Sequence, residues 1–348
     1  EEMRAAAAAA LAAPLLHDAA PAPGTARRTA WTRSYYWTAD QSGPAQLGQV
    51  ASRARLHHVE AAAFSEAFAA DVYGARADAE HLETVGLYNA TDGHWWQRGE
   101  TYHYGDADAF RRIERVERRD GGVTRFTYDA SSLFVTETLD ALGNQTRVEI
   151  DRHTLAARRS VDANDNVTEA AFDALGRPIL TTWHGEVMDA GGVARAYGFD
   201  ALAALVANPD AAVDAVITDP AAHLQGAAAA TIYDLDRWRL QGEPPLVLQL
   251  AREGLVQDGG TGAPQPDGIA ISVTHYDGFG RALQQKTLVD PGPAISRGPG
   301  GNVVLDGAER PVLVDAATRW QVSGHVHYNA KQQVSRRYEP FFSPDWAF

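Results

Sequence analysis

Residues 123–184 read VTRFTYDASSLFVTETLDALGNQTRVEIDRHTLAARRSVDANDNVTEAAFDALGRPILTTWH and repeat with a period of eleven residues. Five aspartates stand at this interval, and each follows an apolar residue: Tyr128–Asp129, Leu139–Asp140, Ile150–Asp151, Val161–Asp162 and Phe172–Asp173. One further step reaches Trp183–His184, where only the apolar residue persists. A short fixed period is typical of stacked architectures, in which each unit buries its face against its neighbours.

Each eleven-residue step divides into a strand and a turn. Residues one, three and five before each aspartate share one strand face, and many are β-branched or aromatic. Aspartate can accept backbone N–H groups in a turn, and a following Gly or Asn tolerates positive φ. We therefore expect consecutive antiparallel strands over 123–184, with the six apolar positions mostly buried. The expected turns lie near 130–132, 141–144, 152–154, 163–166 and 174–177.

The signature returns later in the chain without the strict spacing. Its fullest form is Tyr276-Asp277-Gly278-Phe279-Gly280-Arg281, and Asp173-Ala174-Leu175-Gly176-Arg177 shares the Asp-x-x-Gly-Arg part. Looser forms occur at 233–237 and 328–331. This pattern resembles the YD-repeat (Rhs-repeat) family, whose hallmark is Tyr-Asp-x-x-Gly-Arg.

Flanking segments narrow the resemblance. They are Gly93–Glu100 (GHWWQRGE), Thr318–Gly324 (TRWQVSG) and Tyr338–Trp346 (YEPFFSPDW). Together with Tyr276–Arg281 they resemble the middle and C-terminal part of the B component of bacterial insecticidal Tc (toxin complex) proteins, of the TcdB/TcaC type, over roughly residues 30–348. The SpvB-like and β-propeller regions of that component have no counterpart here, so we expect a fragment whose sheet continues in further strands.

The resemblance implies a mainly β fold: an antiparallel YD-repeat sheet that forms part of a curved hollow shell, with a small helical insertion. It also implies a secreted, structural role in virulence. In that family the B and C components together enclose the toxic C-terminal domain of the C component, and a channel-forming A component delivers it. The C component would be the direct partner and the A component an indirect one. The family's autoprotease site belongs to the C component, and no matching motif occurs here.

The alternative function is a secreted YD-repeat adhesin that binds glycans through its aromatic residues. An enzyme is the third possibility, and no catalytic residue, cofactor or metal ligand is assigned. The net charge of −14 argues against a nucleic-acid partner, and no stretch is long and apolar enough to span a membrane. The absence of cysteine excludes disulfides and cysteine metal sites.

We expect five regions along the chain. An alanine-rich segment and linker (1–29) would be a short helix or a frayed end rather than a signal peptide. Region 30–122 would be mixed β with a helix over 57–73, and 123–185 would hold the regular repeats. Region 186–270 would be a helical and loop insertion, with helices over 200–207 and 211–217 and a loop over 253–268. Region 271–348 would continue the shell, interrupted by a hairpin tip over 291–302.

Three motifs invite a chemical interpretation. His325 and His327 share one strand face and could bind a metal, although an exposed strand pair is the simpler reading. The tryptophans could form a sugar-binding platform, but packing between strands is favoured. The run Asp162-Ala163-Asn164-Asp165-Asn166 is similar to a calcium loop, yet the glycine required at the sixth position is Val167. A side-chain-capped turn is the preferred interpretation.

The calcium alternative is directly testable. We expect calorimetry to detect no calcium binding, because Asp162 and Asp173 are already explained by the repeat register. A calcium-binding signal that disappears in Asp165→Ala would contradict this expectation.

Overall fold

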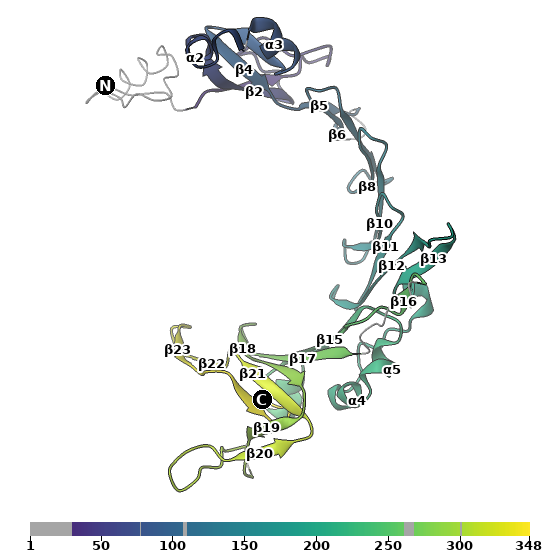
Figure 1. Cartoon of the computed structure of the whole chain (residues 1–348), viewed down its shortest axis with the longest axis vertical. Coiled ribbons are helices and arrows are strands. Elements are labelled where there is room, and N and C mark those ends of the chain that lie inside the picture. Colours follow the sequence, from purple (N-terminus) through teal and green to yellow (C-terminus); the bar gives the residue numbers. More distant parts are fainter. Residues whose placement is uncertain (1–29, 77, 107–109, 261–267, 300) are drawn as a thin grey trace, which may run out of the picture. The chain divides into compact units, whose positions relative to one another are not determined.

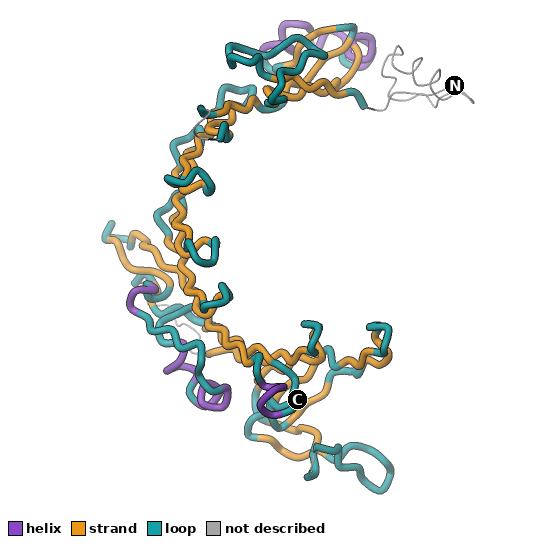
Figure 2. Tube along the Cα trace, turned by 180° about the vertical axis from the view of Figure 1, so that it is seen from behind, coloured by secondary structure: helices purple, strands orange, loops and turns teal. Residues whose placement is uncertain are grey.

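The computed structural model describes residues 30–76, 78–106, 110–260, 268–299 and 301–348. The chain forms two compact units, Glu1–Thr146 and Arg147–Phe348, which are considered in turn. The alanine-rich segment and linker expected over 1–29 lie outside the described residues. So do residues 261–267 of the loop expected over 253–268. Figures 1 and 2 show that strands joined by short turns dominate the described chain, in agreement with the predicted fold class.

The first unit begins with a four-stranded antiparallel sheet. Its strand order is β1 (Thr32–Tyr36), β2 (Leu56–Ser65), β4 (His94–Arg98) and β3 (Tyr88–Thr91). Trp96 is fully buried in it, and the Arg33 guanidinium lies 3.8 Å from the Trp96 ring centroid. Three short helices accompany the sheet: α2 (Glu66–Val72), η1 (Gly74–Arg76) and α3 (Ala79–Thr84).

The prediction of one helix over 57–73 was wrong for its first half. Residues 57–65 belong to β2, which pairs with β1 on one side and β4 on the other. The helix α2 begins only after Ser65, whose hydroxyl accepts the Phe68 N–H as an N-cap. Pairing with two strands outweighed an apolar spacing that is also compatible with a helix.

The first unit ends in strands that pair with their sequence neighbours. These are β5 (Thr101–Tyr104), β6 (Ile113–Glu117), β7 (Val123–Tyr128) and β8 (Val135–Leu139), all antiparallel. In the second unit the same pattern continues through β9 (Gln145–Ile150), β10 (Ala157–Val161), β11 (Val167–Phe172) and β12 (Pro178–Met188). The strands and turns predicted over 123–184 are confirmed.

Beyond β12 the sheet of the second unit continues in the order β14, β15, β17, β18, β21 and β24. Their bounds are Ala229–Asp234, Leu246–Arg252, Ile269–Tyr276, Ala282–Val289, Arg319–Ser323 and Phe341–Ser343. Two hairpins stand beside it: β19 (Gly292–Ile295) with β20 (Leu313–Ala316), and β22 (Val326–Tyr328) with β23 (Val334–Arg337). The hairpin expected over 291–302 is thus longer, returning only at Ala316.

The segment 186–270 contains more strand than the sequence indicated. Besides β14 and β15, it holds β13 (Ala194–Gly198) and β16 (Gln257–Asp258), which extend the sheet beside β12. Its helices are η3 (Leu202–Ala204), α4 (Val213–Thr218), α5 (Pro220–Leu224) and α6 (Arg237–Gln241). The predicted helix over 200–207 is reduced to η3, because Ala201 and Leu205 on either side of it have extended backbone conformations.

The largest apolar core lies where these helices cover the sheet of the second unit. Its buried members are Leu180, Val213, Val216, Leu224, Ala227, Ala230, Ile232, Leu246, Leu248, Leu250, Ile271, Val273 and Trp320. The regular repeats are less covered. Of the six apolar positions expected to be buried, only Val161 is, at 5% exposure, and the other five are half-buried. The expectation of burial was therefore too strong, because these side chains pack mainly against neighbours within one layer.

Candidate functional site: the aspartate turns and a buried lysine

The repeated aspartates close the turns between strands. In the turn 140–144, the Asp140 carboxylate accepts the backbone N–H groups of Leu142 and Asn144, both at 2.8 Å. The Asp140 N–H in turn donates to the Asn144 carbonyl at 3.0 Å, and Gly143 has a φ of 87°. This is a type I turn followed by a left-handed residue, which suits the right-handed twist of a hairpin. One carboxylate thus fixes the conformation of a whole turn.

The same five-residue turn occurs at three other predicted repeat positions, beginning at Asp162, Asp173 and Asp277. It also occurs at Asp189 and Asp306, which the sequence pattern did not reveal, and at Asn329, in the looser form expected at 328–331. Their fourth residues all have positive φ, but only one of the three, Gly192, is glycine. Glu309 and Gln332 replace it in the other two, so neither turn follows the Asp-x-x-Gly pattern.

The turns at Asp129 and Asp151 are one residue longer and close on Phe134 and Ala156. Each longer turn is followed by a five-residue strand, β8 or β10. The five-residue turns at Asp140 and Asp162 are followed by the six-residue strands β9 and β11. Turn length and strand length therefore alternate in opposite directions, and their sum stays at eleven residues.

A tyrosine–arginine contact links segments that are separated in the sequence within each unit. Arg177 at the end of one turn lies with its guanidinium 4.3 Å from the Tyr233 ring centroid, and the Tyr233 hydroxyl donates to the carbonyl of Pro178 at 3.2 Å. The Arg177 Nε also donates to Asp173 at 2.7 Å. The guanidinium is thus held by its own aspartate and covered by a tyrosine from a later strand, β14.

This arrangement recurs twice. Arg281 lies 4.1 Å from the Tyr328 ring, whose hydroxyl donates to the Ala282 carbonyl. Arg112 lies 3.9 Å from the Tyr128 ring, whose hydroxyl donates to the Ile113 carbonyl. In all three cases the accepting carbonyl belongs to the residue after the arginine. We call this unit, made of Arg177/Tyr233, Arg281/Tyr328 or Arg112/Tyr128, the tyrosine–arginine latch.

The regular repeats between these latches use other contacts. His153 lies in the Asp151 turn, and its Nε2 is 2.9 Å from the carbonyl of Ala174 in the Asp173 turn. Arg147 reaches Asp165 at 3.5 Å. Leu139, Ile150, Val161 and Phe172 stand where the hallmark tyrosine would be. Linking of neighbouring turns therefore persists where the signature itself has been lost.

The electrostatics of the turns favours ionised aspartate. The hydrogen bond from the Asn144 side chain, followed by that from its backbone, lowers the pKa of Asp140. The Asn166 side chain does the same to the pKa of Asp162. For Asp173 and Asp277, partial burial opposes ionisation, but hydrogen bonds from Arg177 and Arg281 prevail and lower each pKa. The carboxylates thus accept hydrogen bonds from within their own turns, which agrees with the interpretation of 162–166 as a side-chain-capped turn.

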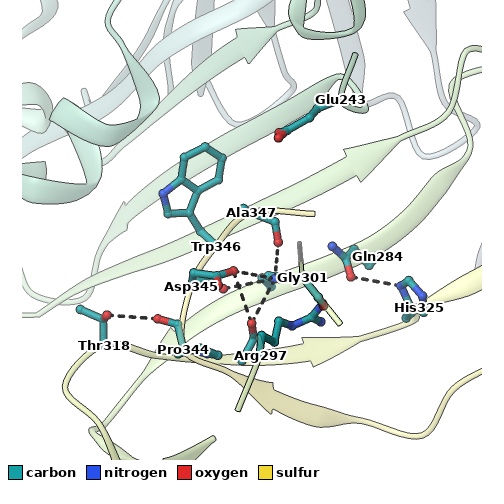
Figure 3. Close-up of polar contacts among 12 residues, drawn as sticks. Glu243, Gln284, Arg297, Gly301, Thr318, His325, Pro344, Asp345, Trp346 and Ala347 are labelled. Carbon is teal, nitrogen blue, oxygen red and sulfur yellow. Dashed lines mark hydrogen bonds and ion pairs between the residues drawn. The ribbon is translucent and has the colours of Figure 1, made fainter. Parts of the chain in front are cut away.

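A second polar cluster lies under the segment 343–348 (Figure 3). Lys286 of β18 is 1% exposed, and its Nζ donates to the Asp345 carbonyl at 3.2 Å, to the Ala347 carbonyl and to the Ser343 hydroxyl at 3.4 Å. Burial lowers the pKa of Lys286 to about 8, although the nearby Asp345 carboxylate favours the charged form. The same segment reaches the helices, since the Trp346 indole donates to Asp214 of α4 at 3.0 Å.

His275 of β17 lies near this cluster. It is fully buried, and neither of its ring nitrogens has a hydrogen-bond partner among the described residues. Burial, reinforced by the charges of Lys286 and Arg237, lowers the pKa of His275 to about 3. His275 is therefore neutral near pH 7, and the second unit folds around an imidazole that resists protonation.

The other candidates from the sequence fit a structural interpretation. His325 and His327 face each other with ring centroids 5.3 Å apart, and the described residues contain no group of three or more His, Asp or Glu placed to hold a metal ion. Trp95, Trp96 and Trp320 are buried, while Trp238 is exposed. No helix in the described part of the chain is long and apolar enough to cross a membrane.

Three solved structures of Tc toxin proteins share this fold. The crystal structure of TcdB2-TccC3 matches with a TM-score of 0.74 and 24% identity, covering 94% of this chain and 15% of that chain. The form without the hypervariable C-terminal region matches at 0.71 and 21%, over 92% of this chain and 17% of that one. A Photorhabdus luminescens Tc holotoxin pore matches at 0.72 and 21%, over 96% and 17%. Neither a family model nor a curated protein matches the sequence.

The tyrosine–arginine latch predicts coupling between residues distant in the sequence. A double-mutant cycle of Arg177→Lys and Tyr233→Leu should give a coupling free energy of about 0.5–2 kcal/mol in urea denaturation, because the stacked guanidinium is lost in either single variant. Arg195→Lys serves as the control, since Arg195 pairs with Asp189 and is half-exposed. Strict additivity of the Arg177 and Tyr233 changes would contradict the latch.

His275 predicts a specific loss of stability in acid. Its folded pKa of about 3 lies below its ordinary value of 6.5, so the unfolded chain binds the proton first and stability falls as the pH drops from 6.5 towards 3. Between pH 6.5 and 5 this contribution should be about 2 kcal/mol. Urea denaturation at both pH values should show a smaller acid loss for His275→Leu than for the native chain. The exposed His327→Leu should leave the loss unchanged.

Proposed function

We propose that this chain is a structural part of the B component of a Tc toxin, contributing YD-repeat strands to a shell that encloses the toxic C-terminal domain of a C component. The observation that supports it most is the match to TcdB2-TccC3 over 94% of this chain. The chain spans only 15% of that matched chain, so the proposal concerns a segment of the wall.

The physical properties of the sheet suit a wall. Each internal strand satisfies its backbone through two neighbours, as β15 does between β14 and β17. Such a ladder offers few free N–H and C=O groups with which an enclosed, unfolded chain could pair. The aspartate turns and tyrosine–arginine latches add a second set of contacts at the ends of the strands. A wall of this kind resists opening between neighbouring hairpins.

In this proposal the C component is the direct partner, since it would complete the shell and supply the cargo. The A component would act only at the stage of delivery, and the assembled toxin would be secreted. The chain itself would contribute no chemistry, which is left to the enclosed domain. An adhesin is the second candidate, and the burial of Trp95, Trp96 and Trp320 removes three of the aromatic residues it would need.

A graft tests the proposal. Residues 30–348 would replace the matching segment of TcdB2-TccC3, and we expect closed particles in electron micrographs, with the enclosed domain protected from added protease. As a control, Asp277→Ala with Arg281→Ala in the graft should loosen one turn and speed proteolysis. A graft that folds but leaves the cargo fully digestible would contradict a wall function, and binding of the chain to a glycan array would support the adhesin.

A further inference from the structure

Three arginines of the first unit gather around one open pocket. Arg53, Arg55 and Arg111 line it together with Phe110, and its volume is about 420 Å³. Arg53 and Arg55 precede β2, while Phe110 and Arg111 belong to the loop between β5 and β6. The volume falls within the ordinary range for sites that hold small ligands. Two separate segments therefore bring three positive charges to one place.

Among the described residues, these three charges have no carboxylate partner. Within residues 30–76, 78–106 and 110–146, no ion pair joins Arg53, Arg55 or Arg111 to an acidic side chain. Several arginines elsewhere are paired with acidic side chains, as Arg237 is with Glu243 and Arg310 with Asp306, while others such as Arg319 donate to a backbone carbonyl. The chain carries 45 acidic against 31 basic residues, so composition does not explain an unpaired cluster of cations.

Arg55 is the member of the cluster whose charge is most unfavourable to bury. It is 8% exposed, and its Nη2 donates to the carbonyls of Ala39 at 3.1 Å and Thr38 at 3.4 Å. Its Nη1 is buried and has no hydrogen-bond partner in the described chain. Burial lowers the pKa of Arg55, and the like charges of Arg111 and Arg53 lower it further. A buried guanidinium beside two others is stabilised by a counter-charge.

Phe110 and Arg111, which complete the pocket, have an unfavourable backbone conformation. Phe110 and Arg111 have φ values of 56° and 50°, a left-handed pair that costs free energy for residues with side chains. Strained residues of this kind concentrate at ligand-binding positions. Here the strain places the Arg111 guanidinium beside the pocket and leaves the Phe110 ring 75% exposed. The pocket therefore combines cations with an apolar surface.

We propose that this pocket binds an oxyanion, a carboxylate or a phosphate, carried on an apolar or aromatic body. Guanidinium groups form paired hydrogen bonds with both oxyanions, and these bonds are stronger than those between neutral groups. The exposed Phe110 ring would pack on the apolar body. Such a ligand supplies the counter-charge that the three arginines lack. The inference is independent of the shell function, because it uses only contacts within the first unit.

Calorimetry of the whole chain at low salt tests the proposal. The probes are benzoate and phenyl phosphate, which differ in the oxyanion, inorganic phosphate, which lacks the ring, and benzyl alcohol, which lacks the charge. We expect benzoate or phenyl phosphate to bind, added salt to weaken binding, and benzyl alcohol not to bind. The tighter of the two aromatic anions identifies the oxyanion, and weaker binding of inorganic phosphate supports the part played by Phe110.

Variants at the rim of the pocket avoid disturbing the buried Arg55. Arg53→Met and Arg111→Met should each raise the dissociation constant by roughly ten-fold or more, since each removes one charge-assisted contact. Arg125→Met on β7 is the matched control, an exposed arginine of the same unit, and should bind as the native chain does. Failure of both aromatic anions to bind would overturn the proposal. The proposal would also be overturned if both rim variants bound the aromatic anions as tightly as the native chain does. Binding of benzyl alcohol as tight as that of the anions would overturn it too.

Discussion

The carboxylate that accepts two backbone N–H groups within its own turn is the interaction on which the rest of this structure depends. Asp140 shows it in its simplest form, five other carboxylates repeat it in five-residue turns, and the side-chain oxygen of Asn329 takes the same place in a sixth. Because each turn is fixed locally, each strand leaves it in register with the one before. A sheet of many strands can then form from contacts between neighbours alone.

The same local character explains what the sequence could predict. The residue types of Asp173 and Gly176 indicate a turn by themselves. The strands and turns over 123–184 could therefore be predicted from the repeated pattern. The helix expected over 57–73 was wrong in its first half, because residues 57–65 pair with β1 and β4, which lie elsewhere in the sequence. The latch between Arg177 and Tyr233 joins residues from different regions of the chain, and the pocket of Arg53 and Arg111 joins two more. No spacing in the sequence connects these pairs.

The buried groups with strongly shifted pKa values lie outside the regular repeats of 123–184. Lys286 and His275 are buried polar groups in the part of the second unit where the helices and the segment 343–348 cover the sheet. The regular strands β9 to β11, by contrast, carry mostly half-buried or exposed side chains, and the aspartates of their turns are ionised and hydrogen-bonded. The repeats are thus chemically uniform, while the covered region holds groups whose protonation is coupled to folding.

The compensating lengths of turns and strands limit how such a chain can evolve. A longer turn at Asp151 is matched by a shorter strand β10, so side chains keep their faces. A single inserted residue would turn every later side chain of its strand to the opposite face. Within the regular strands, substitutions such as Leu139 or Val161 in place of the hallmark tyrosine leave the register unchanged, whereas an inserted or deleted residue needs a compensating change in the adjoining turn. Long additions are instead accommodated between strands, as in the segment 186–270.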